Sequence, residues 1–325
     1  MAAKTILLLT HSKDYYTIDR VEEAIARKGC RPLRFNTDKF PQQVKLSIHL
    51  EAGEVVLSLE VENQQKKFYA KDVYSVWVRK IGTPYISENM DPLLRQGCIT
   101  EAQEVLEIFL RVFDQVRWID DPARVQKAED KLYQLRMAQS VGLVTPRTLI
   151  TNDPQKVQEF YHSLGGDIVA KMITPLTVSM EGNTPFVHTS RIKPEDLQHL
   201  ETLRYSPMAF QEYIPKKYEL RIIYVDGELF TGALHWKTPG EAPVDWRTPE
   251  QEVFTWEHFN LPRTLANKIR ALMKQIGLYF GALDVILTPA GQYVFLEVNP
   301  TGEWGMLERD LGLTISDALA NALTK

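Results

Sequence analysis

The first part of the chain alternates between short apolar runs and amphipathic stretches. Residues 4–10 and Arg31–Asn36 predict two strands, and the helical pattern of Arg20–Lys28 lies between them and ends at Gly29. This β-loop-α-β order predicts a Rossmann-like α/β unit. The unit has no GxGxxG sequence, so it gives no reason to infer dinucleotide binding. Further along, the pattern predicts a hairpin at Val44–Leu50 and Val55–Val61, a strand at Val73–Val78 and a helix at Glu101–Phe113.

The pattern breaks at Trp118–Pro122, where we place the first domain boundary. Beyond the break, Lys171 lies inside an apolar run, where a lysine either reaches solvent from an edge strand or needs an anionic partner. Arg79-Lys80, before the break, follows the end of a predicted strand, which fits either a functional site or a solvated strand terminus. The elements predicted after the break are helices at Asp130–Val141, Pro154–Leu164 and Pro194–Leu203, strands at Arg147–Ile150 and Asp167–Ile173, and a long hairpin at residues 174–190.

The last part of the chain is dominated by two predicted hairpins. The first joins Glu219–Val225 to Glu228–Trp236 through an Asp-Gly turn, and it places Glu219 and Arg221 on one strand face. The second joins residues 282–287 to Gln292–Val298, after a predicted helix at Arg263–Ile276. We therefore predict three domains, at residues 1–118, 119–205 and 206–325.

The second hairpin carries an oxygen-rich face. A two-residue loop at Ala290-Gly291 places Asp284 directly across from Glu297, and strand alternation points Glu297 and Asn299 the same way. Carboxylates that face each other repel, so we expect a cation between them. An all-oxygen set suits Mg²⁺, which takes further ligands from substrate phosphates; the alternative is a solvated face with scattered acids. The side chains expected to face the core are those of Val294, Leu296 and Val298.

Composition narrows the class of protein. The chain has 325 residues, of which 44% are hydrophobic and 25% charged, as in ordinary globular proteins. The net charge of −4 gives no electrostatic case for nucleic acid, and no run is apolar and long enough to predict a signal sequence or a membrane span. Cys30 and Cys98 show neither metal-binding spacing nor a disulfide framework, which predicts a cytoplasmic protein. The seven histidines form no HExxH or triad signature.

The order of motifs resembles the ATP-grasp fold in its RimK-like branch. A lysine on a strand is followed by QEYI, then by E-L-R, then by D…E-x-N on a hairpin. The resemblance covers about residues 120–305, and the first 118 residues resemble the family's leading α/β domain. It implies a mixed α/β protein with a Rossmann-like N-terminal domain, a central lid domain and a C-terminal catalytic domain. The cofactors implied are ATP and Mg²⁺.

The same resemblance suggests a role for individual residues. Asp284, Glu297 and Asn299 resemble the Mg²⁺ ligands, and Lys131 and Lys171 the lysines at the nucleotide phosphates. The family's glycine-rich phosphate loop is not evident between residues 172 and 190. The remaining matches are Gln211, Glu212, Tyr213 and Ile214 as the hinge that reads adenine, Glu219 at the ribose hydroxyls, and Arg221 and Arg247 at the γ-phosphate and the acyl group.

A closer resemblance extends over nearly the whole chain. The opening ILLLTHSKDYYTIDRV, the segments Phe35–Pro41 and Val76–Lys80, the run PMAFQEYIPKKYELRI and the sequence LEVNPTGEW resemble the ATP-grasp macrocyclases that mature microviridins, a graspetide class. This implies a ribosomal precursor peptide as partner, bound through its leader by the hairpin at 174–190 and by Glu195 and Asp196. The two acids also fit simple complementation of a helix dipole. The resemblance implies that Glu or Asp side chains of the precursor are linked to Lys side chains as lactams or to Ser/Thr side chains as lactones, and it favours the lactam-forming member. It further implies a homodimer.

Two alternatives remain open at this point. A RimK-like ligase that adds a free amino acid to a protein or a small carboxylic acid would use the same ATP site. A nucleotide-binding regulatory module without turnover would also bind ATP, although an intact set of metal ligands argues against it.

Overall fold

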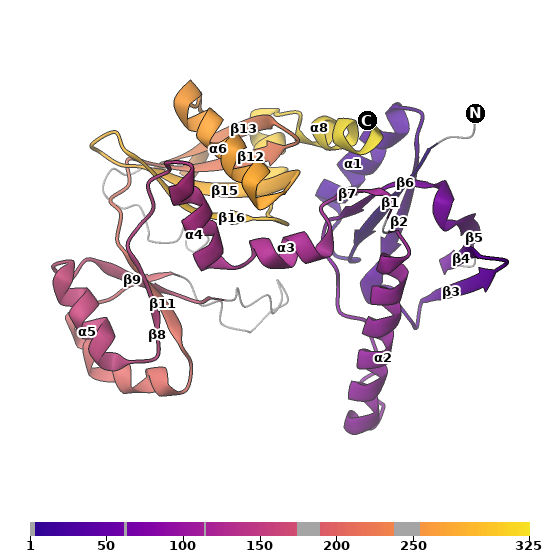
Figure 1. The fold of residues 1–325 in the computed structure, drawn as a ribbon, viewed down its shortest axis with the longest axis horizontal. Helices are drawn as coiled ribbons and strands as arrows, with labels where there is room; N and C mark the ends of the chain where they lie inside the picture. The colour runs from indigo at the N-terminus through magenta and orange to yellow at the C-terminus, as the bar shows by residue number, and fades with distance from the viewer. Residues whose placement is uncertain (1–3, 62–63, 114, 174–188, 237–253) are drawn as a thin grey trace.

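The computed structural model describes residues 4–61, 64–113, 115–173, 189–236 and 254–325. Its first layer is a parallel sheet in the order β2-β1-β6-β7, drawn on the right of Figure 1. The prediction of a Rossmann-like start is confirmed, because β1 pairs in parallel with both β2 and β6. The elements of this part are β1 (Thr5–Thr10), α1 (Tyr16–Arg27), β2 (Arg31–Asn36), β6 (Val73–Val78), α2 (Pro92–Arg111) and β7 (Arg117–Ile119).

A small antiparallel sheet covers one side of this first layer. The predicted hairpin is confirmed as β3 (Val44–Glu51) and β4 (Glu54–Val61), and its turn residues Ala52 and Gly53 both have positive φ. A third strand, β5 (Gln64–Tyr69), pairs with β4 and was not predicted. Short 3₁₀ turns, η1 (Thr37–Lys39) and η2 (Ala70–Asp72), flank this sheet in the sequence.

The central part of the chain forms a separate four-stranded sheet in the order β10-β9-β11-β8, at the lower left of Figure 1. Its core packs α5 and η3 against the strands through residues such as Val157, Leu203 and Phe210. The hairpin predicted at 174–190 lies almost entirely outside the described residues. The elements are β8 (Thr148–Thr151), α5 (Pro154–Ser163), β9 (Ile168–Lys171), β10 (Ser190–Arg191), η3 (Pro194–Arg204) and β11 (Met208–Glu212).

A five-stranded antiparallel sheet, in the order β14-β13-β12-β15-β16, forms the C-terminal part. Along β12 the buried side chains alternate, because Leu220 and Ile222 pack toward α4 and α6 whereas Ile223 packs toward α8 and α1. The elements are α3 (Pro122–Ala128), α4 (Lys131–Ser140), β12 (Tyr218–Val225), β13 (Glu228–Trp236), β14 (Phe254–His258), α6 (Arg263–Ile276), β15 (Phe280–Leu287), β16 (Tyr293–Asn299), α7 (Gly305–Leu311) and α8 (Ile315–Thr324).

One apolar core joins the N-terminal parallel sheet to this C-terminal sheet. Ile6 and Leu8 of β1 belong to the same buried cluster as Phe280 of β15 and Leu319 of α8. In Figure 1, α8 and α1 lie side by side between the two sheets. The two layers are therefore fixed relative to each other by a buried apolar interface.

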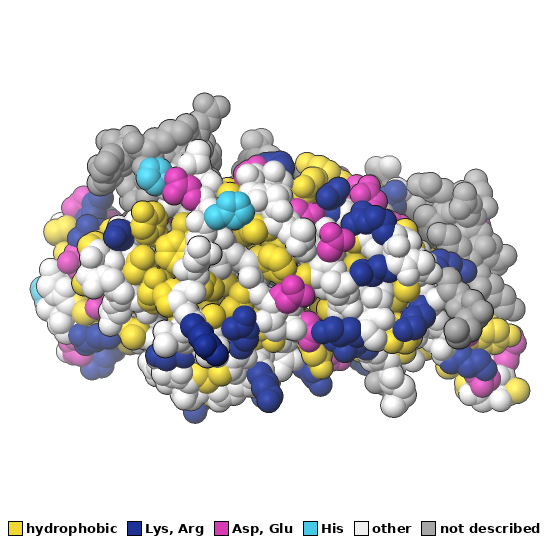
Figure 2. Space-filling model, turned by 90° about the horizontal axis from the view of Figure 1, so that it is seen from above, with side chains coloured by type: hydrophobic (Ala, Val, Ile, Leu, Met, Phe, Trp, Pro, Cys, Tyr) yellow, Lys and Arg dark blue, Asp and Glu magenta, His cyan; other side chains and the backbone are white. Residues whose placement is uncertain are grey.

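The outer surface combines apolar and charged regions. Seen from above, hydrophobic side chains gather over the left half of the molecule, and acidic and basic side chains are interspersed to their right (Figure 2). Within the described ranges, no helix has both the length and the apolar content needed to cross a membrane.

Candidate nucleotide and metal site

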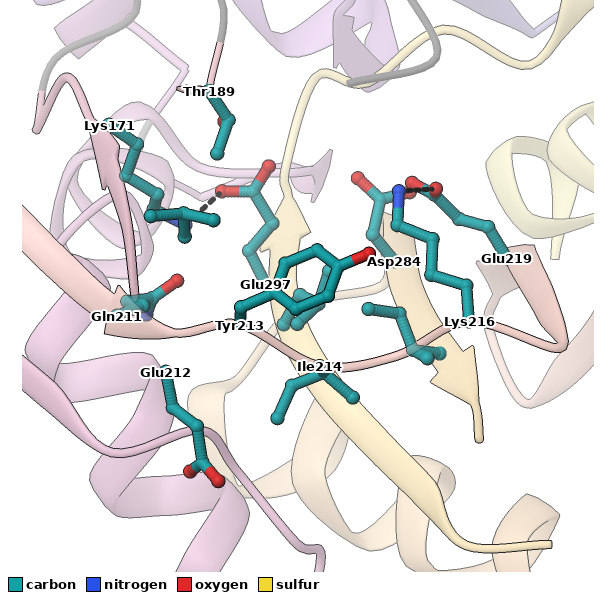
Figure 3. A pocket seen from close by; sticks show the side chains of 13 residues that line it. Lys171, Thr189, Gln211, Glu212, Tyr213, Ile214, Lys216, Glu219, Asp284 and Glu297 are labelled. Carbon is teal, nitrogen blue, oxygen red and sulfur yellow. Dashed lines mark hydrogen bonds and ion pairs between the residues drawn. The ribbon is translucent and has the colours of Figure 1, made fainter. Parts of the chain in front are cut away.

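A pocket opens between the central sheet and the C-terminal sheet. It encloses about 620 Å³ of space, counting the part that is open to solvent. Figure 3 shows that side chains from β9, β11, β15 and β16 converge on it. Its lining includes the predicted residues Lys171, Gln211, Glu212, Tyr213, Ile214, Glu219, Asp284 and Glu297.

The predicted carboxylate pair is present in register. Asp284 of β15 pairs directly with Glu297 of β16, as predicted, but the predicted two-residue loop is wrong. Leu287 pairs with Tyr293 and Thr288 N donates to Gln292 O, so three residues, 289–291, form the loop. Next to the carboxylate pair the register shifts, because Val285 pairs with Phe295 and leaves Leu296 as an extra residue on β16. The prediction that Leu296 faces the core is therefore wrong: it is half-buried and lines the pocket, whereas Val294 and Val298 are buried as expected.

Each carboxylate already contacts cationic side chains. Arg221 lies opposite Asp284 on β12, and its Nη1 donates to Asp284 Oδ1 at 2.7 Å in a buried ion pair. Glu297 Oε2 lies 2.8 Å from Lys131 Nζ and 3.8 Å from Lys171 Nζ. Because β9 lies between β10 and β11, Lys171 is not on an edge strand, so its anionic partner rather than solvent access explains its place.

The residues present fit a magnesium ion bound with a nucleotide. Asp284 and Glu297 supply carboxylate oxygens from neighbouring strands, and Asn299 adds an amide group within 3.5 Å of Glu297 Oε1. Oxygen donors of this kind are those that Mg²⁺ prefers. The lysines that neutralise Glu297 are also long enough to turn toward phosphate oxygens. The same two cations can therefore pair with Glu297 in the free protein and with phosphate when a nucleotide is bound.

The hinge segment at Gln211–Ile214 is held by its backbone and by two side chains. Glu212 exchanges hydrogen bonds with Arg147, because its N–H donates to Arg147 O at 2.9 Å and its Oε2 accepts from Arg147 N at 3.2 Å. Gln211 Nε2 donates to Thr148 Oγ1 at 3.0 Å, and Tyr213 N donates to Asp167 O. Figure 3 shows the carboxylate of Glu212 pointing away from the pocket. The side chain of Glu212 therefore anchors the hinge.

Lys216 is a pocket residue that the sequence did not single out. Its Nζ lies 2.6 Å from Glu219 Oε2, and the two side chains are only 6% and 9% exposed. Figure 3 draws the pair next to Asp284, on the same side of the pocket. The spacing of three residues across the start of β12 was the one available signal, and it is weak because such pairs are common on protein surfaces.

Three predicted site residues lie away from this pocket or outside the described part. Glu195 and Asp196 open η3; Asp196 Oδ2 accepts from Lys193 N at 2.8 Å, and Glu195 is exposed near Lys193 Nζ. Arg247 lies outside the described residues, as does most of the predicted hairpin at 174–190. The roles of these residues stay predictions.

Comparison with known families identifies the fold. The model of the MvdD pre-ATP-grasp domain matches residues 5–126, and that of the prokaryotic glutathione synthetase ATP-grasp domain matches residues 130–308, more than half of the chain. The chain belongs to the ATP-grasp family. The predicted fold class and the prediction of a ligase that uses ATP and Mg²⁺ are confirmed by this membership.

Several ATP-grasp proteins are similar over nearly the whole chain. Macrocyclase MdnB from Microcystis aeruginosa MRC is 45% identical, with a TM-score of 0.83 and coverage of 98% of this chain and 99% of that one. Macrocyclase MdnC from the same organism, bound with precursor peptide MdnA, is 34% identical, with a TM-score of 0.87 and the same coverage. A RiPP-associated ATP-grasp ligase from Chryseobacterium gregarium, in complex with ADP and a leader and core peptide, is 30% identical, with a TM-score of 0.87 and coverage of 99% and 96%.

A more distant relative is an ATP-grasp enzyme of small-molecule metabolism. Glutathione synthetase from Thermosynechococcus vestitus is 27% identical over 195 residues, which is 59% of this chain and 57% of that protein. The similarity thus extends over little more than half the length of that relative. A shared fold does not by itself identify the substrate.

Proposed function

We propose that the protein is an ATP-dependent peptide macrocyclase of the microviridin-maturing kind. It activates Glu or Asp side chains of a ribosomal precursor peptide and joins them to side chains of the same peptide. The observation that carries this proposal is the 45% identity to a macrocyclase over 98% of the chain. The convergence of Asp284, Glu297 and two lysines on one pocket supports it, because these groups suit a metal–nucleotide complex.

The first step is the activation of a carboxylate, because an ionised Glu or Asp side chain is a poor electrophile. A carboxylate oxygen of the peptide attacks the γ-phosphorus of ATP, the bond to the β-phosphate oxygen breaks, and ADP leaves. Lys131 and Lys171 would turn from Glu297 to the phosphate oxygens, and Asp284, Glu297 and Asn299 would hold Mg²⁺. When bound, the ion neutralises charge on the phosphates and orients them for in-line transfer.

The second step forms the ring. A lysine ammonium of the peptide loses one proton, and the neutral amine attacks the acyl carbon. The nitrogen loses a second proton as inorganic phosphate leaves and the amide bond forms. Arg221 lies beside Asp284 and would bind the oxyanion, a role typically worth about 3–4 kcal/mol. We propose the same role for Arg247 from its sequence position. The acyl phosphate and the attacking amine belong to one bound peptide. Their proximity raises the rate of attack, so the reaction does not require a dedicated strong base.

The leader of the precursor would bind away from the chemistry. We propose Glu195 and Asp196 on η3 as its acidic contacts, together with the hairpin at 174–190. The exposed position of Glu195 supports this role, since its carboxylate is accessible to a leader arginine. Segment 125–205 would act as a lid that excludes water from the acyl phosphate.

We further propose a homodimer, because of the family resemblance, and a cytoplasmic location, because of the cysteine usage.

A second candidate function has some support from distant relatives. Alongside the glutathione synthetase, an α-aminoadipate–LysW ligase from Sulfurisphaera tokodaii is 23% identical over 209 residues. This similarity supports a RimK-like ligase that adds a free amino acid to an acidic acceptor. The two functions predict opposite mass changes, because a ring loses water whereas ligation adds an amino-acid residue.

The test is incubation with ATP, Mg²⁺ and a precursor peptide of the MdnA kind, followed by mass spectrometry. We expect the loss of one water for each ring, with ADP released in equal amount. Mild alkali then separates the two chemistries, because esters open and amides persist; we expect the products to persist. A product that gains the mass of a free amino acid would instead support the RimK-like ligase.

A further inference from the structure

The pair Arg79-Lys80 at the carboxyl end of β6 reaches across to the loop after β16. The side chain of Arg79 is only 1% exposed, so its interpretation as a solvated strand terminus is wrong. Its Nη1 donates to Thr301 O at 2.5 Å, and its Nη2 donates to Glu303 Oε2 at 2.6 Å. Lys80 binds the other oxygen of the same carboxylate. Two cations of the N-terminal sheet thus hold loop 300–304.

The same loop contacts the metal-facing residues on its other side. Glu303 O accepts two hydrogen bonds from Arg221, at 3.3 Å from Nε and 3.1 Å from Nη2. The remaining terminal nitrogen of Arg221, Nη1, donates to Asp284 Oδ1. An unbroken series of hydrogen bonds therefore runs from Arg79 through Glu303 and Arg221 to Asp284.

Gly302 shows how closely the loop packs against the site. A Cβ atom added to Gly302 would lie 2.5 Å from the Cβ of Ala282 and 3.0 Å from both Arg221 Nη2 and Asn299 Cβ. These distances are shorter than the separation of about 3.5–4.0 Å at which non-bonded carbon atoms normally pack. A shift of the loop by a fraction of an ångström would consequently move Arg221 or Asn299.

The charges around Arg79 favour a fixed geometry. Burial opposes ionisation of Glu303, but Arg79 and Lys80 together outweigh burial and lower the pKa of its carboxyl group. Arg79 Nε also lies 3.6 Å from Asp14 Oδ2, and the Asp14 carboxylate accepts hydrogen bonds from Thr10 at Oδ2 and from Thr17 at Oδ1. The Arg79 guanidinium is therefore oriented by a carboxylate group at each end.

We propose that Arg79 is a positioning residue for the metal end of the nucleotide site. By holding Thr301 and Glu303 it fixes loop 300–304, and the loop fixes Arg221 against Asp284. The N-terminal sheet thereby tunes Mg²⁺–nucleotide binding without contacting the nucleotide. This inference rests on the proposed metal ligands Asp284, Glu297 and Asn299, and it does not depend on which substrate the enzyme cyclises or ligates.

The expected effect follows from the geometry of arginine. Residues that orient metal ligands typically cost about 10–100-fold in metal affinity when they are replaced. Lysine keeps the positive charge but has one compact ammonium group, so it cannot reach Thr301 O and Glu303 Oε2 together as the planar guanidinium does. Arg79→Lys should therefore lose Mg²⁺-dependent ADP affinity even though it keeps the positive charge. This result would show that the geometry of the Arg79 contacts, and not the charge alone, supports the site.

The experiment measures ADP affinity by titration calorimetry, with Mg²⁺ and with EDTA, on Arg79→Lys and Arg79→Met. We expect the Mg²⁺-dependent gain in ADP affinity to fall about tenfold in both variants. Affinity in EDTA should stay within about twofold of the parent protein, because the hydrogen bonds of segment Gln211–Ile214 run to Arg147, Thr148 and Asp167 in the central part of the chain. The control is Arg20→Met, since Arg20 on α1 also pairs across the interface, with Glu308 on α7 at 3.2 Å.

Arg20→Met should keep the full Mg²⁺-dependent gain. The proposal is overturned if either Arg79 variant keeps that gain, or if Arg20→Met loses it equally, since the effect would then be general weakening of the interface. If the Arg79 variants do not fold, Gly302→Ala moves the loop while leaving Arg79 in place, and an unchanged gain in that variant overturns the proposal. No precursor peptide is present, so failure here leaves the macrocyclase proposal standing.

Discussion

Replacing Asp284 by Asn removes one charge from the centre of the site and changes little else. Asp284 pairs with Arg221 on one side and faces Glu297 on the other. The side chains of Asp284 and Arg221 are each 7% exposed, and their Nη1–Oδ1 distance is 2.7 Å. Asparagine keeps the shape and can still accept the hydrogen bond, but it leaves the buried guanidinium opposite a neutral group.

Two opposing effects set the change in the free energy of unfolding. Loss of a charge-assisted hydrogen bond costs about 1.5–3 kcal/mol, whereas relief of the cross-strand repulsion with Glu297 returns about 0.2–1 kcal/mol. The net expectation is a loss of about 1–2 kcal/mol in apo protein, which leaves the fold intact. Loss of a metal ligand is more serious for turnover: about 4 kcal/mol of metal-derived stabilisation corresponds to about 10³-fold in rate.

The assay combines urea unfolding with ADP release and precursor mass change at saturating ATP and Mg²⁺. The matched control is Asp226→Asn, because Asp226 lies in the turn after β12 and pairs with Arg117 and Lys325, away from the pocket. Its φ of 45° suits asparagine, so we expect near-normal turnover. The metal assignment would be refuted if Asp284→Asn kept turnover within about tenfold of the parent protein and showed unchanged Mg²⁺ dependence.

Three further predictions concern the nucleotide, the leader and the pH dependence of folding. Lys216→Met removes the ammonium that orients buried Glu219, so ADP affinity measured by calorimetry should fall about tenfold with and without Mg²⁺; a loss only with Mg²⁺ would contradict this. Glu195→Lys should weaken binding of a fluorescently labelled leader peptide and leave ADP affinity intact, whereas Glu201→Lys, at an exposed position of the same helix, should leave both affinities unchanged. Equal leader affinity in the two variants would show that Glu195 only complements the helix dipole. Burial raises the pKa of Asp120 to about 7, against the backbone N–H groups of Tyr279 and Phe280 that favour its ionised form. Since the native state then holds a proton that the unfolded state has lost, the free energy of unfolding should fall by up to about 4 kcal/mol between about pH 4 and about pH 7. Urea unfolding of Asp120→Asn should lack this component, and identical pH dependence in both proteins would contradict the raised pKa.

The strands and helices with clear apolar periodicity could be predicted closely. Arg31–Asn36, Val73–Val78 and Arg263–Ile276 have the same bounds in the structure as in the pattern. Helix α1 begins at Tyr16 rather than Arg20, because Thr17 and Ile18 are buried in a stretch whose Asp, Tyr and Thr residues read as a polar loop. Strand β5 was missed because its sequence QQKKFY is too polar to show the alternation of a half-buried strand.

The candidate site could be predicted where one strand register fixed it. The opposition of Asp284 and Glu297 was predicted correctly, although the loop has three residues instead of two, because the extra residue on β16 restores the predicted register. The bulge at Leu296 could not be foreseen, because an extra residue leaves no mark in an apolar segment. Partners far apart in the sequence were also hidden: Arg79 and Glu303 are separated by most of the chain, and only the packed fold brings them to 2.6 Å.

The proposed ligase function depends most directly on where a divalent ion binds. Crystals grown with Mn²⁺ and ADP would report that position through anomalous scattering, since Mn²⁺ takes similar oxygen ligands to Mg²⁺. We predict a peak in contact with carboxylate oxygens of Asp284 and Glu297 and with Asn299 Oδ1, at about 2.0–2.2 Å, and bridged to ADP phosphates. A peak bound elsewhere, with these three side chains still paired to Arg221, Lys131 and Lys171, would contradict it.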